Sequence, residues 1–167
     1  MEISHAFYKT DLGYVLLGHD GKGICFLQLG DTQKELLCIL QTTYKNATLK
    51  QMTPTQEKKF AVLVKNLVAG KGKGNAKITL SAQGTPFQEK VWRYLEKIPV
   101  GKTRSYTDVA KAIKQPKAVR AVAGACAANR VGLLIPCHRI LRSDGDFSGY
   151  RWGRNRKVTL LKREGIA

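Results

Sequence analysis

The sequence is short of cysteine, of acidic residues and of long apolar runs, and each shortage excludes a class of protein. Its four cysteines form no Cys-x-x-Cys pair, so no zinc framework, disulfide scaffold or metal site is predicted. No apolar run approaches the roughly 20 residues that span a bilayer. The first ten residues lack the basic-then-apolar pattern of a signal peptide. We therefore expect a cytoplasmic protein that has no membrane partner.

Positive charge is abundant and unevenly distributed. The chain has 29 lysines and arginines against 12 acidic residues, a formal net charge of +17. Residues 1–80 hold 11 basic and 6 acidic side chains, whereas residues 81–167 hold 18 and 6. A basic half is typical of a protein that binds a polyanion, of which nucleic acid is the commonest. The alternative is a basic protein whose charges serve solubility alone.

Residues 1–80 predict a small α/β structural domain with an antiparallel sheet. The lysines and glycines at 70–74 interrupt the pattern and predict a mobile link. No catalytic constellation is present in this half. The expected elements are strands at 3–9, 14–18, 23–29 and 77–80, and helices from a cap at Asp31 or Thr32 to about Tyr44 and from Thr53-Pro54 to near Gly70.

Residues 81–167 predict a mostly helical second domain. Thr85-Pro86 begins a helix that ends before Pro99. Ser105 can cap a short helix, residues 115–117 predict a turn, and a second helix follows over 118–128. Two short helices joined by a tight turn are typical of a helix-turn-helix.

The helix expected over 118–128 has little side-chain bulk, and Arg120 is its only long polar residue. A slim helix can bring its backbone close to a narrow groove, where one long cation can fill a gap in a base stack. The alternative is a close-packed core helix. The small residues are Ala118, Ala121, Ala123, Gly124, Ala125, Ala127 and Ala128.

Cys137 and His138 are the candidate reactive pair. A thiol with an ordinary pKa of about 8.5 is only a few per cent ionised at pH 7. A nearby base or cation raises the fraction of thiolate, which is the nucleophile. In a strand, neighbouring side chains point to opposite faces, so a contact between the two must be bent or bridged by water. The other cysteines, Cys25, Cys38 and Cys126, are interpreted as buried packing thiols.

The string Ile135-Pro136-Cys137-His138-Arg139 resembles the acceptor motif of the O6-alkylguanine-DNA alkyltransferases, the methylated-DNA–protein-cysteine methyltransferases. Further matches follow the family's order, and their spacing fits without gaps from Tyr106 to Glu164. Residues 148–153 are most similar to the C-terminal half of the bacterial adaptive-response (Ada) protein. The first half matches only by length and strand pattern. The further matches are Ser105-Tyr106, Arg120-Ala121-Val122, Asn129, Ser148-Gly149-Tyr150 and Glu164-Gly165.

The resemblance implies a ribonuclease-H-like domain over 1–80 and a DNA-binding, alkyl-acceptor domain over 81–167. It implies DNA repair by irreversible, single-turnover transfer of an alkyl group from O6-alkylguanine, and from O4-alkylthymine, to an internal cysteine. The implied partner is double-stranded DNA with an alkylated base, bound through its minor groove by a monomer, and the implied reaction needs no cofactor.

The resemblance also implies a role for each matching residue in the chemical step. Cys137 is the acceptor, and His138 deprotonates it through a water molecule. Glu164 orients and charges the imidazole, as an acid orients a triad histidine. Asn129 braces the loop that carries the cysteine.

Two further sets are implied for DNA and for the base pocket. Tyr106 rotates the 3′ phosphate and donates to guanine N3, and Arg120 replaces the extruded base. Ala121 and Ala123 belong to the same DNA-binding helix. The pocket wall is formed by Tyr150, Arg151 and Trp152.

The chain departs from the resemblance at two pocket positions. Many members have a small residue where Arg151 stands, including a serine that can contact the guanine oxygen, and a glycine where Trp152 stands. Three rival functions fit the sequence less well. A protein that only binds alkylguanine lacks the cysteine, a helix-turn-helix regulator needs a dimerisation or effector segment, and a cysteine hydrolase needs an oxyanion site.

Overall fold

The computed structural model describes residues 1–147 and 149–166 and divides the chain into two compact units. The first is Met1–Ala82 with Arg130–Gly132, and the second is Gln83–Asn129 with Leu133–Ala167. The three later residues join the first unit because Leu27 N donates to Arg130 O (2.9 Å) and Gly132 N donates to Leu27 O (2.8 Å). Within the described ranges, no helix is both long and apolar enough to cross a membrane.

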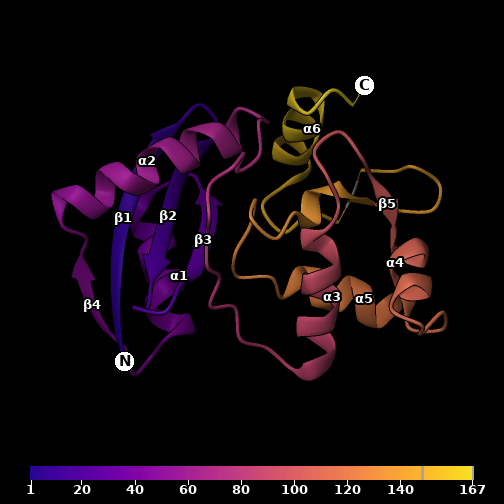
Figure 1. Ribbon diagram of the computed structural model, residues 1–167, viewed down its shortest axis with the longest axis horizontal. Coiled ribbons are helices and arrows are strands. Elements are labelled where there is room, and N and C mark those ends of the chain that lie inside the picture. The colour runs from indigo at the N-terminus through magenta and orange to yellow at the C-terminus, as the bar shows by residue number, and fades with distance from the viewer. Residues whose placement is uncertain (148, 167) are drawn as a thin grey trace. The chain divides into compact units, whose positions relative to one another are not determined.

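The first unit is built on a four-stranded mixed sheet in the order β3-β2-β1-β4 (Figure 1). Strand β2 pairs antiparallel with both β1 and β3, but β4 pairs parallel with β1. The prediction of an antiparallel sheet is therefore wrong at this edge. The strands are β1 (Glu2–Thr10), β2 (Gly13–His19), β3 (Ile24–Gly30) and β4 (Thr48–Gln51).

Strand β4 was not expected, and the strand expected at 77–80 is not formed. Strand β4 has three exposed residues out of four, so it shows no apolar alternation. Its pairing depends on the free edge of β1, which lies far away in the sequence. At the other edge, Leu80 makes only a single bridge to Ile24.

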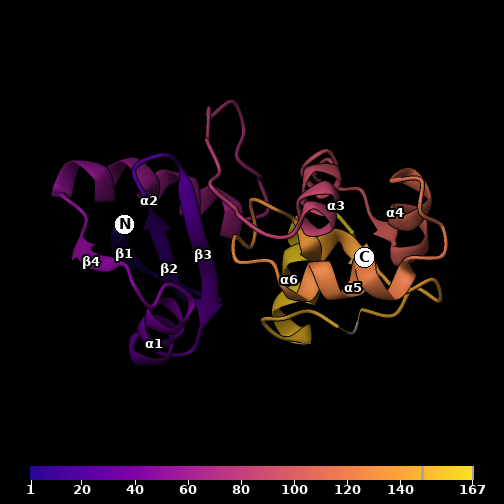
Figure 2. The same cartoon turned by 90° about the horizontal axis from the view of Figure 1, so that it is seen from below.

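Two helices cover opposite faces of this sheet, as Figure 2 shows. Helix α1 (Gln33–Thr43) begins after Thr32, whose side chain accepts from Glu35 N. Helix α2 (Pro54–Val68) begins with a reciprocal capping box between Thr53 and Gln56. Such caps satisfy backbone donors that the first helical turn leaves unpaired. Both helices agree with the sequence prediction.

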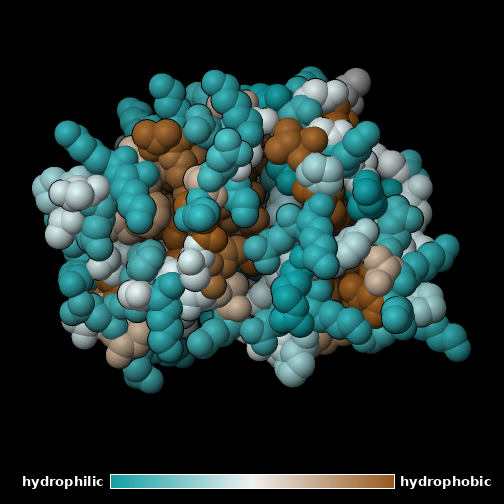
Figure 3. All heavy atoms as spheres, in the orientation of Figure 1, coloured by the Kyte–Doolittle hydropathy of each residue, from teal (hydrophilic) through white to brown (hydrophobic). Residues whose placement is uncertain are grey.

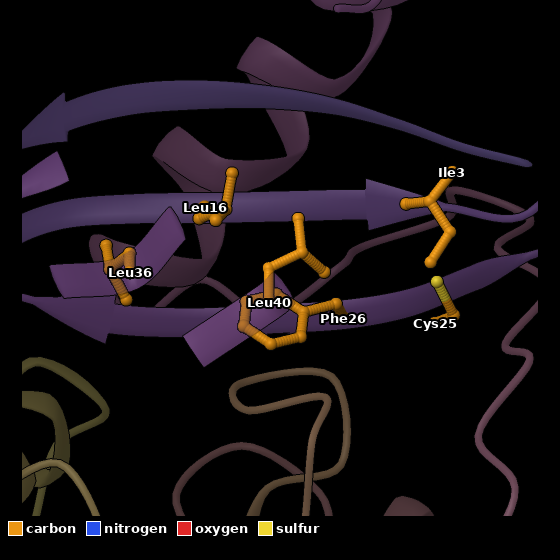
Figure 4. Close-up of a cluster of buried hydrophobic side chains, with 6 residues drawn as sticks. All are labelled: Ile3, Leu16, Cys25, Phe26, Leu36 and Leu40. Carbon is orange, nitrogen blue, oxygen red and sulfur yellow. The ribbon is translucent and has the colours of Figure 1, made fainter. Parts of the chain in front are cut away.

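The face under α1 holds a closed apolar cluster (Figure 4). Leu36 and Leu40 of α1 lie over Leu16 and Phe26, while Ile3 and Cys25 point toward each other nearby. Burying one such side chain contributes about 1.5–3 kcal/mol. Cys25 is therefore a packing thiol, as expected. Cys38 is exposed on α1, so its assignment to the core is wrong.

The second unit is mostly helical, as the sequence predicts. Helix α3 begins with a capping box between Thr85 and Gln88. It is joined to α5 by a buried hydrogen bond from Trp92 Nε1 to Ala125 O (2.8 Å). The helices are α3 (Pro86–Glu96), α4 (Tyr106–Ala112), α5 (Val119–Ala127), the 3-10 helix η1 (Cys137–Arg139) and α6 (Arg154–Arg163), and the short parallel strands are β5 (Arg104–Ser105) and β6 (Ile140–Leu141).

Helices α4 and α5 lie where two short helices were expected. Ser105 caps α4 by accepting from Asp108 N, and the connection to α5 turns at Lys114, whose φ is +63°. On the face shown in Figure 3, hydrophilic side chains project from α3 and α4. Helix α6 was not predicted, although its buried residues Lys157, Leu160 and Leu161 follow helical spacing.

Candidate active site

Cys137 begins a tight turn rather than lying in a strand. Pro136 precedes the 3-10 helix η1, in which Arg139 N donates to Pro136 O (3.0 Å). Ile140 N then closes the turn by donating to Cys137 O. The strand in which Cys137 and His138 would face opposite sides is not formed, and in a 3-10 turn neighbouring side chains point about 120° apart. Both side chains are buried, with Cys137 5% and His138 1% exposed.

Asn129 holds the turn over residues 136–140, called the acceptor turn below because it carries the candidate acceptor Cys137. Its side chain is fully buried, and Nδ2 donates to Ile135 O (2.9 Å) and to Cys137 Sγ (3.4 Å). A donor aimed at the sulfur stabilises the thiolate relative to the thiol. Asn129 lies two residues after the last residue of α5, so the end of that helix fixes the position of the sulfur.

His138 is held in one tautomer by Glu164. His138 Nε2 lies 2.9 Å from Glu164 Oε2. Burial raises the pKa of the Glu164 carboxyl, but hydrogen bonds from His138 and Arg139 outweigh it and lower that pKa to about 2. The carboxylate can therefore only accept, and Nε2 must carry the hydrogen. Burial lowers the pKa of His138, so the ring is neutral and Nδ1 keeps its lone pair.

The lone pair on His138 Nδ1 is available for a proton. This nitrogen is buried and has no hydrogen-bond partner among residues 1–147 and 149–166. A buried acceptor without a partner is costly unless water or a reacting group satisfies it. It lies in the side chain that directly follows Cys137. The arrangement provides a base next to a thiol.

Arg139 is a site residue that sequence reasoning did not assign a role. Its Nε donates to Glu164 Oε1 (2.9 Å), its Nη2 to Oε2 (3.0 Å), and its Nη1 to Ile98 O (2.6 Å). Glu164 is the C-cap of α6, where the helix dipole disfavours an acid. The two-pronged contact with Arg139 offsets that cost. Breaking such a buried pair typically costs about 3–5 kcal/mol.

Lys157 is a second residue that the sequence reading missed. It is 0% exposed, and its Nζ donates to Ile140 O (2.5 Å) at the end of the acceptor turn. Burial lowers the pKa of Lys157. The available signal was its place in line with Leu160, Leu161 and Glu164 on the buried face of α6, but that signal requires the helix to be recognised first.

Cys137 does not ionise without help. Burial raises the pKa of its thiol, while the Asn129 amide and the charges of Lys157 and Arg151 act in the opposite direction. The sulfur is therefore a buried thiol at rest that requires a base and is surrounded by groups that stabilise its anion. Within the described ranges, no cluster of three or more metal-ligating side chains is present.

The expected pocket residues lie close to this pair. The ring of Tyr150 meets His138 edge-on with centroids 6.3 Å apart, and Trp152 in turn meets Tyr150 at 5.2 Å. Tyr150 and Trp152 are buried, whereas Arg151 is exposed. Ser148, which belongs to the same expected motif, lies outside the described residues. The structure thus places the Tyr150 ring against His138, with the Trp152 ring packed behind it.

Tyr106 also approaches the acceptor. It is the first residue of α4 and is half-buried. Burial raises its pKa to about 12, and the nearby Cys126 and Cys137 add to the effect. The tyrosine is therefore a neutral phenol that can donate a hydrogen bond. A Cβ on Gly149 would lie 3.3 Å from its hydroxyl.

The remaining expected residues lie on α5. Arg120 and Ala121 are exposed, together with Gly124 and Ala127, and these spacings put them on one helical face. A Cβ on Gly124 would meet nothing within 4 Å. Ala123 is half-buried. The slim face of α5 is therefore open, which argues against a helix enclosed in the core.

Comparisons with known proteins place the chain among DNA methyltransferases that act on methylated DNA. Residues 86–166 match the family model of the 6-O-methylguanine DNA methyltransferase DNA-binding domain. The chain is 41% identical to the bifunctional transcriptional activator/DNA repair enzyme Ada of Escherichia coli over 98% of its own length, and it spans 46% of that relative. It therefore corresponds to about half of that longer protein.

Two further comparisons cover nearly all of both proteins. The methylated-DNA–protein-cysteine methyltransferase of Candida albicans is 36% identical over 97% of this chain and 96% of its own. The structure of Mycobacterium tuberculosis OGT in complex with DNA superposes with a TM-score of 0.78, at 27% identity, over 98% of this chain and 92% of the other. The α/β fold with its mixed sheet is shared. The chain belongs to the methylated-DNA–protein-cysteine methyltransferase family.

Proposed function

We propose that this protein repairs DNA by moving an alkyl group from the O6 atom of guanine, or the O4 atom of thymine, onto Cys137 Sγ. The observation that carries the proposal is the buried Nδ1 of His138, which is held as a lone-pair acceptor by Glu164 beside a buried thiol. A general base must lie within reach of the proton that it removes, directly or through one water.

The reaction consumes the protein. The Cys137 proton passes through a water molecule to His138 Nδ1, and the resulting imidazolium is stabilised by the Glu164 carboxylate. The thiolate attacks the alkyl carbon in line, an S–C bond forms, and the C–O6 bond breaks with its electron pair going to guanine. Tyr106 donates a hydrogen bond to guanine N3 as that charge develops. The product thioether has no leaving group that these residues can displace, so each molecule reacts once.

DNA binding uses the α4–α5 pair as a helix-turn-helix in the minor groove. The exposed face of α5 at Arg120, Ala121 and Gly124 supports this assignment, because it lets the backbone approach the groove. Arg120 enters the stack when the damaged base leaves, at a cost of a few kcal/mol of unstacking. The formal charge of +17 supplies the phosphate contacts. The protein acts as a monomer, in the nucleoid when bound to DNA.

The first unit is assigned a structural role in a ribonuclease-H-like fold. Three antiparallel strands followed by a parallel β4 next to β1 support this assignment. Sheet and helices close a core of their own, and the described residues of this unit contain no counterpart of the Cys137–His138–Glu164 group.

Labelled substrate tests the proposed function directly. The full chain is incubated with duplex DNA that carries radiolabelled O6-methylguanine, digested, and its peptides are separated. We expect one equivalent of stable label on the peptide with Cys137, and none in Cys137→Ala, which should still bind the duplex. Binding without transfer by the unaltered chain would indicate a protein that only recognises damage, and label transferred by Cys137→Ala would remove Cys137 as the acceptor.

A further inference from the structure

One side chain connects the pocket segment Tyr150–Gly153 to the end of α5. Arg151 Nη1 donates to Asn129 O (2.8 Å) and to Ala127 O (3.3 Å). These carbonyls lie 22 and 24 residues earlier in the chain. The contact is therefore tertiary, although Arg151 follows directly after the pocket residue Tyr150.

The end of α5 benefits from this charge. The last carbonyls of a helix have no partner within it, and the helix dipole gives that end a partial negative charge. Helix α5 has no basic residue in its own last turn, and Ala118 at its start makes no side-chain cap. The Arg151 guanidinium supplies from another segment the positive group that usually stands in the last turn.

The same guanidinium also contacts the pocket segment Tyr150–Gly153. Its Cζ lies 5.6 Å from the centre of the Trp152 ring, within the range of a cation–π contact. Trp152 packs on Tyr150, and Tyr150 packs on His138. Gly149 and Gly153 flank this segment with φ of +87° and +102°, a conformation that only glycine adopts readily. The segment thus lies between two permissive backbone positions.

Asn129 contacts both Arg151 of the pocket segment and the turn that carries Cys137. Its backbone oxygen accepts from Arg151, while its side chain donates to Ile135 O and to Cys137 Sγ. A displacement of the α5 end would reach both the pocket segment and the sulfur. Arg151 is therefore placed to connect helix position, pocket order and acceptor position.

We propose that Arg151 is a positioning residue that holds the pocket segment Tyr150–Gly153 in its binding-competent arrangement by bonding to the carbonyls at the end of α5. This proposal rests on the proposed function, because it concerns the pocket of the same reaction. A site that is competent only part of the time binds its substrate more weakly by that fraction. Loss of the contact then weakens substrate binding, whether or not the base is in DNA.

The test compares Arg151→Ala with Arg154→Ala, a matched control that removes the same charge from an exposed arginine at the start of α6. Single-turnover transfer rates are measured at increasing concentrations of substrate, once with duplex DNA that contains O6-methylguanine and once with the free O6-methylguanine base. Arg151→Ala should raise the half-saturating concentration about tenfold for both substrates, a larger factor than the fall in the limiting rate that follows from losing a positive charge near Cys137. Arg154→Ala should change neither the half-saturating concentration nor the limiting rate for the free base. Arg151→Lys, which keeps the charge and a donor, should recover part of the loss.

Hydrogen exchange of the unliganded protein gives a readout that does not need the reaction. Peptides that cover 150–157 and 124–130 should exchange faster in Arg151→Ala, while peptides from β1–β3 and the second half of α6 stay protected. Unchanged exchange at 150–157 would overturn the proposal. So would weakening confined to duplex DNA with a lower salt slope, which identifies a phosphate contact. Should the unaltered chain transfer no label, the exchange result still decides the role of Arg151.

Discussion

His138 Nε2 and Glu164 Oε2 lie 2.9 Å apart, and the two side chains are each only 2% exposed. Glu164 also receives two bonds from Arg139. Helix α6 therefore ends on the acceptor turn, and one carboxylate fixes the tautomer of the base and anchors the residue next to it. A variant that removes the negative charge of Glu164 but keeps its size tests whether the charge, and not only the packing of the side chain, matters for the reaction.

Glu164→Gln should shift the pH dependence of Cys137 alkylation upward. The pKa of Glu164 is lowered to about 2, so its charge stabilises the His138 imidazolium across the whole pH range of the measurement and is lost only as the pH falls through about 2. Without the charge, the proton leaves Cys137 less readily, and the apparent pKa of the thiol rises. The measurement is the rate of Cys137 modification by a small uncharged alkylating agent between pH 5 and 10. A profile identical to that of the unaltered protein would exclude Glu164 from the proton path.

Lys157→Met should change the reactivity of Cys137 more than the stability of the fold. Met has similar length and no charge, so its burial avoids the desolvation cost of the ammonium, although Ile140 O loses its donor. We expect the free energy of unfolding to change by less than about 2 kcal/mol. The alkylation profile should move to higher pH, because a positive charge near Cys137 is lost. Denaturant unfolding and the same pH series measure the two effects, and a stability loss with an unchanged profile would make Lys157 purely structural.

Arg120→Ala should slow repair in duplex DNA more than reaction with the free O6-methylguanine base. Arg120 is exposed on the open face of α5, so its loss should not disturb the core. Filling the vacated stack matters only when a base has to leave the duplex. Single-turnover rates on the two substrates give the comparison. If both reactions slow by the same factor, the arginine supports the fold or the pocket instead of base extrusion.

Trp152→Gly should admit a larger alkyl group. Trp152 is 7% exposed and packs on Tyr150, and bulk in a fitted site commonly costs about 1–3 kcal/mol. We expect the unaltered protein to react poorly with O6-benzylguanine and well with O6-methylguanine. The variant should recover much of the benzyl reaction, by roughly one to two powers of ten in rate. Parallel loss of both reactions with a lower melting temperature would show that the indole supports the core.

The sequence predicts elements whose signals are local. Thr32, Thr53, Thr85 and Ser105 all cap helices in the structure, because capping depends on residues three apart. Strand β4 and helix α6 were missed for the same physical reason. A short polar strand and a helix with a lysine in its buried face gain their stability from partners distant in sequence, as at β1 and at Ile140.

The candidate site also contains residues that the sequence could indicate and residues that it could not. Motif order could indicate Cys137, His138 and Glu164, since each stands at a recognisable position in the chain. The motif contains Arg139 but does not indicate its role. Its hydrogen bonds to Glu164 and to Ile98 O form only once the end of α6 packs against the acceptor turn. The 3-10 geometry at Cys137 was also not foreseen, because a buried apolar run before Pro136 reads equally well as a strand.

The bond from Trp92 Nε1 to Ala125 O has an optical consequence. The chain contains two tryptophans, and both belong to the second unit: Trp92 reports on the underside of α5, and Trp152 on the pocket segment. Intrinsic emission excited at the red edge of the indole band therefore observes only the unit that carries Cys137. The tyrosines of the first unit do not contribute there. Emission from a Trp152→Phe variant would follow the indole hydrogen bond to α5 alone, and so record in real time any shift of that helix on contact with DNA.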